Sequence, residues 1–163
     1  MFTLAEIYDL GIRIEKNGEK FYRNALKQAW SAPIAEMLKT LAEEEVKHVD
    51  FFVKRMDALQ HNRENPFLDE MSTSMLKDIL GDQTFSLKET DVSALRSVED
   101  LVAIAIEFEK DTILFYEMVG SFITDEEARR ELKEIIAEEE RHVKLFESYG
   151  DKKVHLPKLN HKP

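Results

Sequence analysis

Two stretches of the sequence decide the fold: EEVKHVDFF at positions 44–52 and EEERHVKLF at positions 138–146. The second begins 94 residues after the first, and a comparison at this spacing aligns residues 2–53 with residues 96–147 without a gap. Twelve of the 52 aligned positions are identical, which indicates two copies of one structural unit. The identical pairs are Ile12/Ile106, Glu15/Glu109, Lys16/Lys110, Phe21/Phe115, Tyr22/Tyr116, Leu38/Leu132, Lys39/Lys133, Glu44/Glu138, Glu45/Glu139, His48/His142, Val49/Val143 and Phe52/Phe146.

The pattern of apolar residues is typical of long helices. Apolar side chains recur at alternating spacings of three and four, and only five glycines and four prolines interrupt the chain. The sequence therefore predicts an all-α protein with helices over residues 3–29, 31–59, 97–123 and 124–150. The expected N-terminal caps are Thr3 with Glu6, Ser31, Ser97 with Asp100, and Thr124 with Glu127, and the last helix is expected to stop at Gly150.

Each copy is a pair of helices joined by a very short turn, which makes an antiparallel helical hairpin. We expect hairpins over residues 3–60 and 97–150, joined by one long crossover over residues 61–96 that contains a short helix at residues 72–80. Two such hairpins pack as a four-helix bundle, so residues 1–150 are expected to form one domain. Residues 151–163 contain four lysines and two prolines, and we expect this basic tail to take no part in the chemistry.

Composition and charge exclude several classes of function. The 163 residues carry 33 acidic and 23 basic side chains, a formal net charge of −10, which makes nucleic acid and anionic membranes unexpected partners. The longest aliphatic run, residues 101–106, is too short to cross a bilayer, and the first residues do not resemble a secretory signal, which favours a cytoplasmic location. The sequence has no cysteine, so a bound metal would need Glu, Asp and His as ligands.

Polar residues interrupt the core-facing stripes of all four predicted helices. The first and third helices each carry one glutamate on an otherwise apolar or aromatic face. The second and fourth helices each carry a glutamate followed three residues later by a histidine, both on the apolar seam. These core-facing residues are Glu15, Glu45, His48, Glu109, Glu139 and His142.

The four glutamates are expected to meet at one level of the bundle. In each hairpin they stand fifteen residues before and after the turn, at Trp30 or Thr124, which corresponds to about 22 Å along each helix. Four unpaired buried carboxylates would cost several kcal/mol per ion, and the core-facing stripes contain no Lys or Arg to offset them. Two divalent cations would balance the four negative charges. This favours a dinuclear metal centre over the alternative, a buried polar network without metal.

Neighbouring polar residues have two interpretations. Tyr22 and Tyr116 fall two turns after the single glutamates of their helices, where each hydroxyl group either hydrogen-bonds a ligand carboxylate or is satisfied within ordinary core packing. Glu44 and Glu138 repeat as well, but they lie beside the seam, which favours a solvated face or a partner of the ligands over direct ligation. Surface positions are expected for Glu19, Glu43, Glu107, Glu140, His61, His155 and His161.

The same residues carry a resemblance to a known family. The pattern EK at 15–16 with FY at 21–22, EVKH at 45–48, EKD at 109–111 with FY at 115–116, and EERH at 139–142 resembles the rubrerythrin branch of the ferritin-like superfamily, over residues 2–149. The resemblance implies a ferritin-like bundle and a centre of two iron ions, although nitrogen and oxygen ligands also accept manganese or zinc. The implied ligands are Glu15, Glu45, His48, Glu109, Glu139 and His142, with Glu45 and Glu139 as the bridging carboxylates.

By similarity, the chain would be an oxidoreductase that reduces hydrogen peroxide or oxygen with electrons from an external donor such as a rubredoxin-like protein. Two differences stand out: full-length rubrerythrins carry a cysteine-ligated rubredoxin domain, whereas this sequence has no cysteine, and Thr112 stands where they have a further glutamate. One alternative is a ferroxidase or iron-handling protein whose substrate is Fe(II). Another is a metal-binding helical module without redox chemistry. The resemblance also suggests a homodimer, in which the crossover would pack on a second bundle, although one sequence shows no interface.

Overall fold

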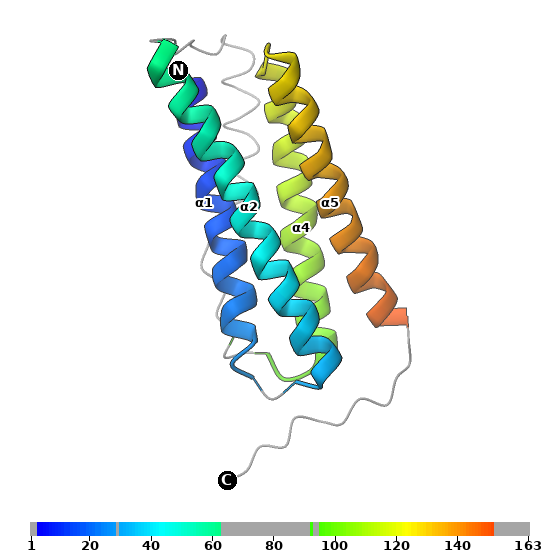
Figure 1. Ribbon diagram of the computed structural model, residues 1–163. Coiled ribbons are helices and arrows are strands. Elements are labelled where there is room, and N and C mark those ends of the chain that lie inside the picture. Colours follow the sequence, from blue (N-terminus) through cyan, green and yellow to red (C-terminus); the bar gives the residue numbers. More distant parts are fainter. Residues whose placement is uncertain (1–2, 29, 63–91, 93–94, 152–163) are drawn as a thin grey trace.

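The computed structural model describes residues 3–28, 30–62, 92 and 95–151. Within these ranges it contains the helices α1 (Leu4–Ala25), α2 (Ala32–Asn62), α4 (Val98–Phe122) and α5 (Glu126–Asp151). Figure 1 shows α1 beside α2 and α4 beside α5, each pair antiparallel, and the two hairpins together form a four-helix bundle. The predicted all-α bundle of two hairpins is confirmed. The expected short helix at residues 72–80, most of the crossover and nearly all of the basic tail lie outside the described residues.

The helices begin where side chains satisfy the first free amide groups. At α1 the Glu6 amide donates to Thr3 Oγ1 over 3.3 Å and the Thr3 amide donates to Glu6 Oε2 over 2.7 Å, which is the predicted capping box. Ser97 caps α4 as predicted, because its Oγ accepts from the Asp100 amide. The cap predicted at Thr124 is wrong: α5 begins one residue later, and Asp125 Oδ1 accepts from the Ala128 amide over 2.7 Å. A carboxylate also interacts favourably with the positive end of the helix dipole.

The helix ends differ by a few residues from those predicted. Helix α1 stops at Ala25 rather than residue 29, because the amides of Lys27 and Gln28 bond to carbonyls three residues back and the Trp30 indole donates to the Ala25 carbonyl over 2.6 Å. These bonds occupy carbonyls that would otherwise accept the i to i−4 hydrogen bonds of a longer helix. Helices α2 and α5 run slightly further than predicted, to Asn62 and Asp151. None of the described helices is both long and apolar enough to cross a membrane.

The apolar core forms two separate clusters, one toward each end of the bundle. One lies around Ile7, Phe52 and Val119, and the other around Phe21, Leu38 and Leu101. In each helix the polar core-facing residues fall in the chain between side chains of these two clusters. The bundle therefore holds a polar layer at mid-height, covered by apolar packing above and below.

A glycine in α1 allows close contact with the Phe52 ring. A Cβ at Gly11 would lie 2.8 Å from Phe52 Cε1, closer than real side-chain contacts allow. Phe52 itself is fully buried and packs against Tyr8 and Tyr116, with ring centroids 6.2 and 5.1 Å away. Phe52 is thus held between α1 and α4 and links the two hairpins.

Replacing Phe52 by alanine is expected to destabilise the bundle by about 3–5 kcal/mol, because the surrounding helices cannot close the space that the ring fills. Leu114→Ala is the control: Leu114 is 45% exposed on α4, and its loss should change stability by no more than about 0.5 kcal/mol. Urea denaturation followed by circular dichroism measures both effects. Equal losses of stability in the two variants would contradict the described packing.

Candidate metal centre

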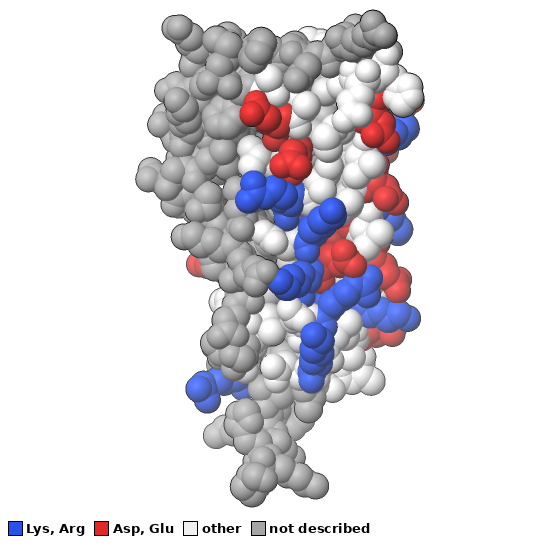
Figure 2. All heavy atoms as spheres, turned by 90° about the vertical axis from the view of Figure 1, so that its left-hand side faces the viewer, with Lys and Arg blue, Asp and Glu red and all other residues white. Residues whose placement is uncertain are grey.

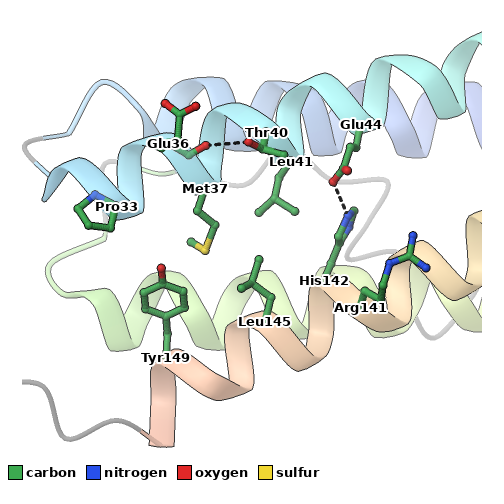
Figure 3. A pocket seen from close by; sticks show the side chains of 10 residues that line it. All are labelled: Pro33, Glu36, Met37, Thr40, Leu41, Glu44, Arg141, His142, Leu145 and Tyr149. Carbon is green, nitrogen blue, oxygen red and sulfur yellow. Dashed lines mark hydrogen bonds and ion pairs between the residues drawn. The ribbon is translucent and has the colours of Figure 1, made fainter.

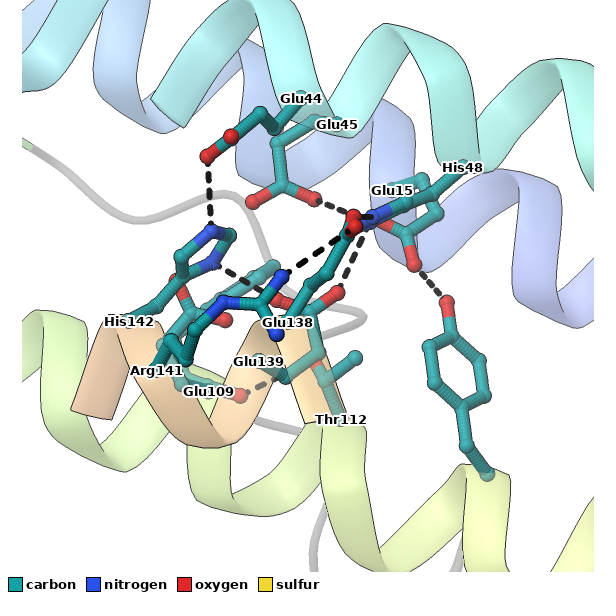
Figure 4. Close-up of polar contacts among 12 residues, drawn as sticks. Glu15, Glu44, Glu45, His48, Glu109, Thr112, Glu138, Glu139, Arg141 and His142 are labelled. Atoms are coloured by element: carbon teal, nitrogen blue, oxygen red, sulfur yellow. Dashed lines mark hydrogen bonds and ion pairs between the residues drawn. The ribbon is translucent and has the colours of Figure 1, made fainter. Parts of the chain in front are cut away.

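Four helices contribute six polar side chains to the layer at mid-height of the bundle (Figure 4). All six are at most 5% exposed. The structure therefore brings together every residue that the sequence pattern placed at this level. Helix α1 contributes Glu15, α2 contributes Glu45 and His48, α4 contributes Glu109, and α5 contributes Glu139 and His142.

Glu139 lies between the two histidines. Its Oε1 is 2.9 Å from His48 Nδ1 and its Oε2 is 2.8 Å from His142 Nδ1. His48 Nδ1 is also 3.5 Å from Glu15 Oε2, and His142 Nδ1 is 3.5 Å from Glu109 Oε1. His48 Nδ1 also lies 3.7 Å from Glu45 Oε2, so Glu139 is the carboxylate nearest to the Nδ1 atoms of both histidines.

The six side chains divide into two overlapping groups of four. In each group one oxygen or nitrogen from every residue lies within 4.8 Å of the others. Ligands on opposite sides of one ion lie about 4.2 Å apart when each bond is about 2.1 Å, so this spacing suits a single metal ion per group. Both groups contain Glu45 and Glu139, so these two carboxylates stand between the two positions. The groups are Glu15, Glu45, His48 and Glu139, and Glu45, Glu109, Glu139 and His142.

Buried atoms without hydrogen bonds show that the cluster needs a further partner. Every one of the six residues has at least one buried oxygen or nitrogen that makes no hydrogen bond, including both oxygens of Glu139 and Nδ1 of both histidines. The Nδ1 atoms of His48 and His142 lie 2.9 and 2.8 Å from Glu139 oxygens, but neither atom makes a hydrogen bond. Leaving such groups unsatisfied costs about 1–3 kcal/mol each, and more for charged ones. This inward-facing set of carboxylate and imidazole atoms is one that a pair of first-row divalent metal ions fits.

The outer nitrogen of each histidine is held by a glutamate of the opposite hairpin. His48 Nε2 lies 3.0 Å from Glu138 Oε2, and His142 Nε2 lies 2.9 Å from Glu44 Oε2. A carboxylate at Nε2 keeps the proton on that nitrogen and leaves the lone pair of Nδ1 facing the cluster. Of the two interpretations of Glu44 and Glu138, partnership with the histidines therefore agrees with the contacts.

Two tyrosines cross between the hairpins in the same reciprocal way. Tyr22 of α1 donates its hydroxyl hydrogen to Glu109 of α4, and Tyr116 of α4 donates to Glu15 of α1. Both rings are fully buried. The hydroxyl groups therefore contact the two glutamates that belong to only one group each, and they fix one oxygen of each carboxylate.

A buried cation that the sequence pattern did not identify is Arg55. It continues the seam of α2 one step beyond Phe52 and is 9% exposed. Its Nη2 donates to Glu131 Oε2 over 2.6 Å, and its guanidinium carbon lies 5.6 Å from the centre of the Phe51 ring. Arg55 is thus paired outside the cluster and does not offset the four buried glutamates.

Two small residues border the cluster. A Cβ at Gly18 would lie 3.0 Å from Phe108 Cε1 and 3.1 Å from Glu45 Cδ, so glycine there lets α1 approach the shared carboxylate of Glu45. The sequence pattern placed Gly18 on the core-facing side of its helix, but only the contact distances show this role. Thr112, at the equivalent position of the second repeat, turns its hydroxyl group to the Phe108 carbonyl over 3.0 Å.

Burial and the crowding of like charges move the acid–base equilibria of the cluster. Burial and neighbouring carboxylates raise the pKa of Glu45 well above its ordinary value and that of Glu109 to about 7. Burial alone would lower the pKa of each histidine, but the adjacent carboxylates outweigh it and raise the pKa of His142 to about 10 and that of His48 further. Burial would raise the pKa of Glu139, whereas the two histidines beside it lower it to about 2. Protons on the histidines therefore offset the carboxylates when no metal is bound.

A cavity of about 570 Å³ lies between α2 and α5 and reaches the cluster from one side (Figure 3). Met37, Leu41 and Leu145 make its walls apolar, while Glu44 and His142 lie at one end. The cavity therefore gives a small molecule a path to the outer side of His142.

These features define the class of protein: a ferritin-like four-helix bundle with a buried cluster of carboxylates and histidines suited to two metal ions. A family model described as Rubrerythrin matches residues 6–149, and the chain belongs to the rubrerythrin family. A solved protein from Thermotoga maritima, described as a ferritin-like diiron-carboxylate protein, has the same fold, with a TM-score of 0.71 at 22% identity over 93% of this chain and 96% of that one. None of the curated proteins compared with the chain matches it. The resemblance predicted from the motifs is confirmed.

Gly18→Ala is expected to lower the affinity for metal, because the added methyl group pushes against Phe108 and the Glu45 carboxylate. Gly120→Ala is the matched control on α4, since its new Cβ would meet the nearest atom, Leu132 Cδ2, at an ordinary 3.6 Å. The control should gain up to about 1 kcal/mol of stability from the better helix propensity of alanine and keep its metal. Metal titration and thermal unfolding separate the two. Equal metal affinity in both variants would show that Gly18 does not position Glu45.

Zinc(II), a redox-inert probe, is expected to release protons when it binds and to bind more tightly as the pH rises. Since the pKa values of His142 and Glu109 are raised to about 10 and about 7, both groups still hold protons at pH 6, and metal must displace them. Affinity should rise about tenfold per pH unit for each proton released. Calorimetry in buffers of different ionisation enthalpy counts these protons. Binding that releases none between pH 6 and 7 would contradict the described protonation.

Proposed function

We propose that the chain is a di-iron oxidoreductase that reduces hydrogen peroxide or oxygen with electrons from a donor outside the bundle. The observation that carries this proposal is the pair of overlapping ligand groups that share Glu45 and Glu139. The six clustered residues would hold the two ions, three carboxylates and one histidine in each group. When bound, a pair of iron ions supplies the two electrons that split an oxygen–oxygen bond.

The chain's own residues support this chemistry in three ways. Four glutamates balance the charge of two divalent ions. Glu44 and Glu138 keep the Nδ1 lone pairs directed inward, and the two tyrosines hold the outer carboxylates. The apolar clusters on both sides of the polar layer exclude bulk water, which strengthens the electrostatic interactions inside.

The cavity beside His142 favours entry of a small oxidant from the α2–α5 side. Hydrogen peroxide and oxygen are both much smaller than about 570 Å³. Glu44, whose carboxylate lies beside His142 at the end of the cavity, would attract Fe(II), although Arg141 also lines the cavity. This second observation favours an alternative, a ferroxidase in which Fe(II) is the substrate rather than a resident cofactor.

Protein purified without oxygen is expected to hold close to two iron ions per chain and to be oxidised by one equivalent of hydrogen peroxide. Glu45→Ala should lose most of the metal, because Glu45 belongs to both groups, and His142→Ala should lose at least one ion. Glu43→Ala and Glu140→Ala are controls with exposed carboxylates from the same two helices and should keep both ions. Elemental analysis and stopped-flow absorbance measure content and oxidation.

Repeated turnover of peroxide with an added reductant supports the oxidoreductase. Faster reaction with oxygen, followed by release of Fe(III) without turnover, supports the ferroxidase. Stoichiometric zinc after native expression, or variants with unchanged metal content, would contradict a di-iron centre at these residues.

A further inference from the structure

The outer face of α1 carries a continuous row of cations. Four basic residues of α1 follow one another at spacings of three, four and three, so they lie along one face of the helix, and a fifth, Lys27, follows in the turn just after the helix ends. The four members on the helix span about 15 Å along its axis. All five side chains are exposed, and we call this row the basic stripe. Its members are Arg13, Lys16, Lys20, Arg23 and Lys27.

The stripe breaks the symmetry of the internal repeat. The residues 94 positions later are two glutamates, a lysine, a leucine and a serine. A row with charge +5 in the first copy therefore corresponds to a row with charge −1 in the second. The buried ligands, by contrast, are the same in both copies. The bundle geometry therefore does not require the stripe. The counterparts are Glu107, Lys110, Leu114, Glu117 and Ser121.

The stripe is a local exception on an acidic chain whose net charge is −10. Figure 2, which faces the side of the molecule that lies on the left in Figure 1, shows Lys and Arg side chains gathered in a band. Glu19 offsets part of the charge through its 2.6 Å ion pair with Arg23. Arg13 and Lys16 make no ion pair with a described residue. The charges of Arg13 and Lys16 are therefore available to a partner.

The stripe lies on the reverse side of a helix that contributes to the centre. Lys16 directly follows Glu15, whose carboxylate is fully buried in the cluster, and Tyr22 lies on the same inner face. A partner on the stripe would thus be separated from the cluster by little more than the thickness of α1, about 10 Å. Electron transfer needs such a short separation between donor and acceptor.

We propose that the basic stripe docks an acidic electron-carrier protein that reduces the metal centre. This inference rests on the proposed function, since two reduced one-electron carriers would supply the two electrons that, with two protons, convert hydrogen peroxide into two water molecules. A short row of charges suits the small interfaces of electron-transfer complexes, which bury less than about 1,200 Å². Charges also act over only about 8 Å at physiological ionic strength. A compact acidic protein can therefore meet the stripe alone, whereas a nucleic acid strand would also meet the acidic remainder of the surface.

The test compares two variants with the same change in charge. Arg13→Glu/Lys20→Glu reverses two cations of the stripe, and Lys133→Glu/Lys144→Glu reverses two exposed cations of α5. The probe is a purified acidic rubredoxin. Its affinity for the zinc-loaded protein is measured by calorimetry, and the rate at which the iron-loaded protein oxidises reduced rubredoxin in the presence of peroxide is measured by stopped flow, both from low to high salt.

The stripe variant is expected to lose about tenfold or more in affinity and in second-order rate at low salt, with the difference shrinking at high salt, while the α5 variant changes by about twofold or less. Both variants should react with peroxide as the unaltered protein does after chemical reduction. Equal losses in the two variants, or stripe-dependent binding of a single-stranded oligonucleotide but not of rubredoxin, would overturn the docking surface. An unaltered protein that does not react with peroxide would instead overturn the proposed function.

Discussion

The rest of the structure depends on the burial of four glutamates beside two histidines at mid-height of the bundle. Without a compensating charge, each buried carboxylate costs several kcal/mol. The described residues offset part of this cost through Tyr22, Tyr116 and protonated histidines, yet seven oxygen and nitrogen atoms of the cluster still lack a hydrogen bond. The cluster is therefore arranged for a ligand with positive charge. The apolar clusters on either side exclude water. This raises the free-energy cost of burying the carboxylates, because no solvent can stabilise their charges.

The contacts around the cluster cross from one hairpin to the other. Tyr22 reaches Glu109 and Tyr116 reaches Glu15, while Glu44 and Glu138 hold the histidines of the opposite copy. The duplication thus produces a site with two equivalent halves, each completed by the other. The surroundings differ: a cavity adjoins His142, and the residues of the second repeat that correspond to the basic stripe carry a net charge of −1. If the proposed function holds, this asymmetry would give the oxidant and the electron donor separate approaches to one centre.

Sequence reasoning succeeded where local chemistry decides the structure and failed where contacts between helices decide it. The caps at Thr3 and Ser97 follow from side chains that reach amides three residues on, so the local sequence was enough. The cap of α5 shifted from Thr124 to Asp125 because both residues can cap and the backbone path selects one. Arg55 continued the seam of α2, but its pairing with Glu131 depends on how α5 packs. The role of Gly18 depends on the position of Glu45 across the helix pair.

By itself, the sequence determined the helical fold class, the duplicated hairpins and the identity of the six clustered residues. The spacing of residues along a helix decides which side chains share a face and how far along the helix they lie. Only the tertiary structure decided which histidine nitrogen faces the cluster, and which residue of the opposite hairpin each tyrosine and each outer glutamate contacts. These arrangements join atoms about 90–100 residues apart in the chain. Their geometry follows from the rotation and spacing of packed helices, which no pattern within one helix specifies.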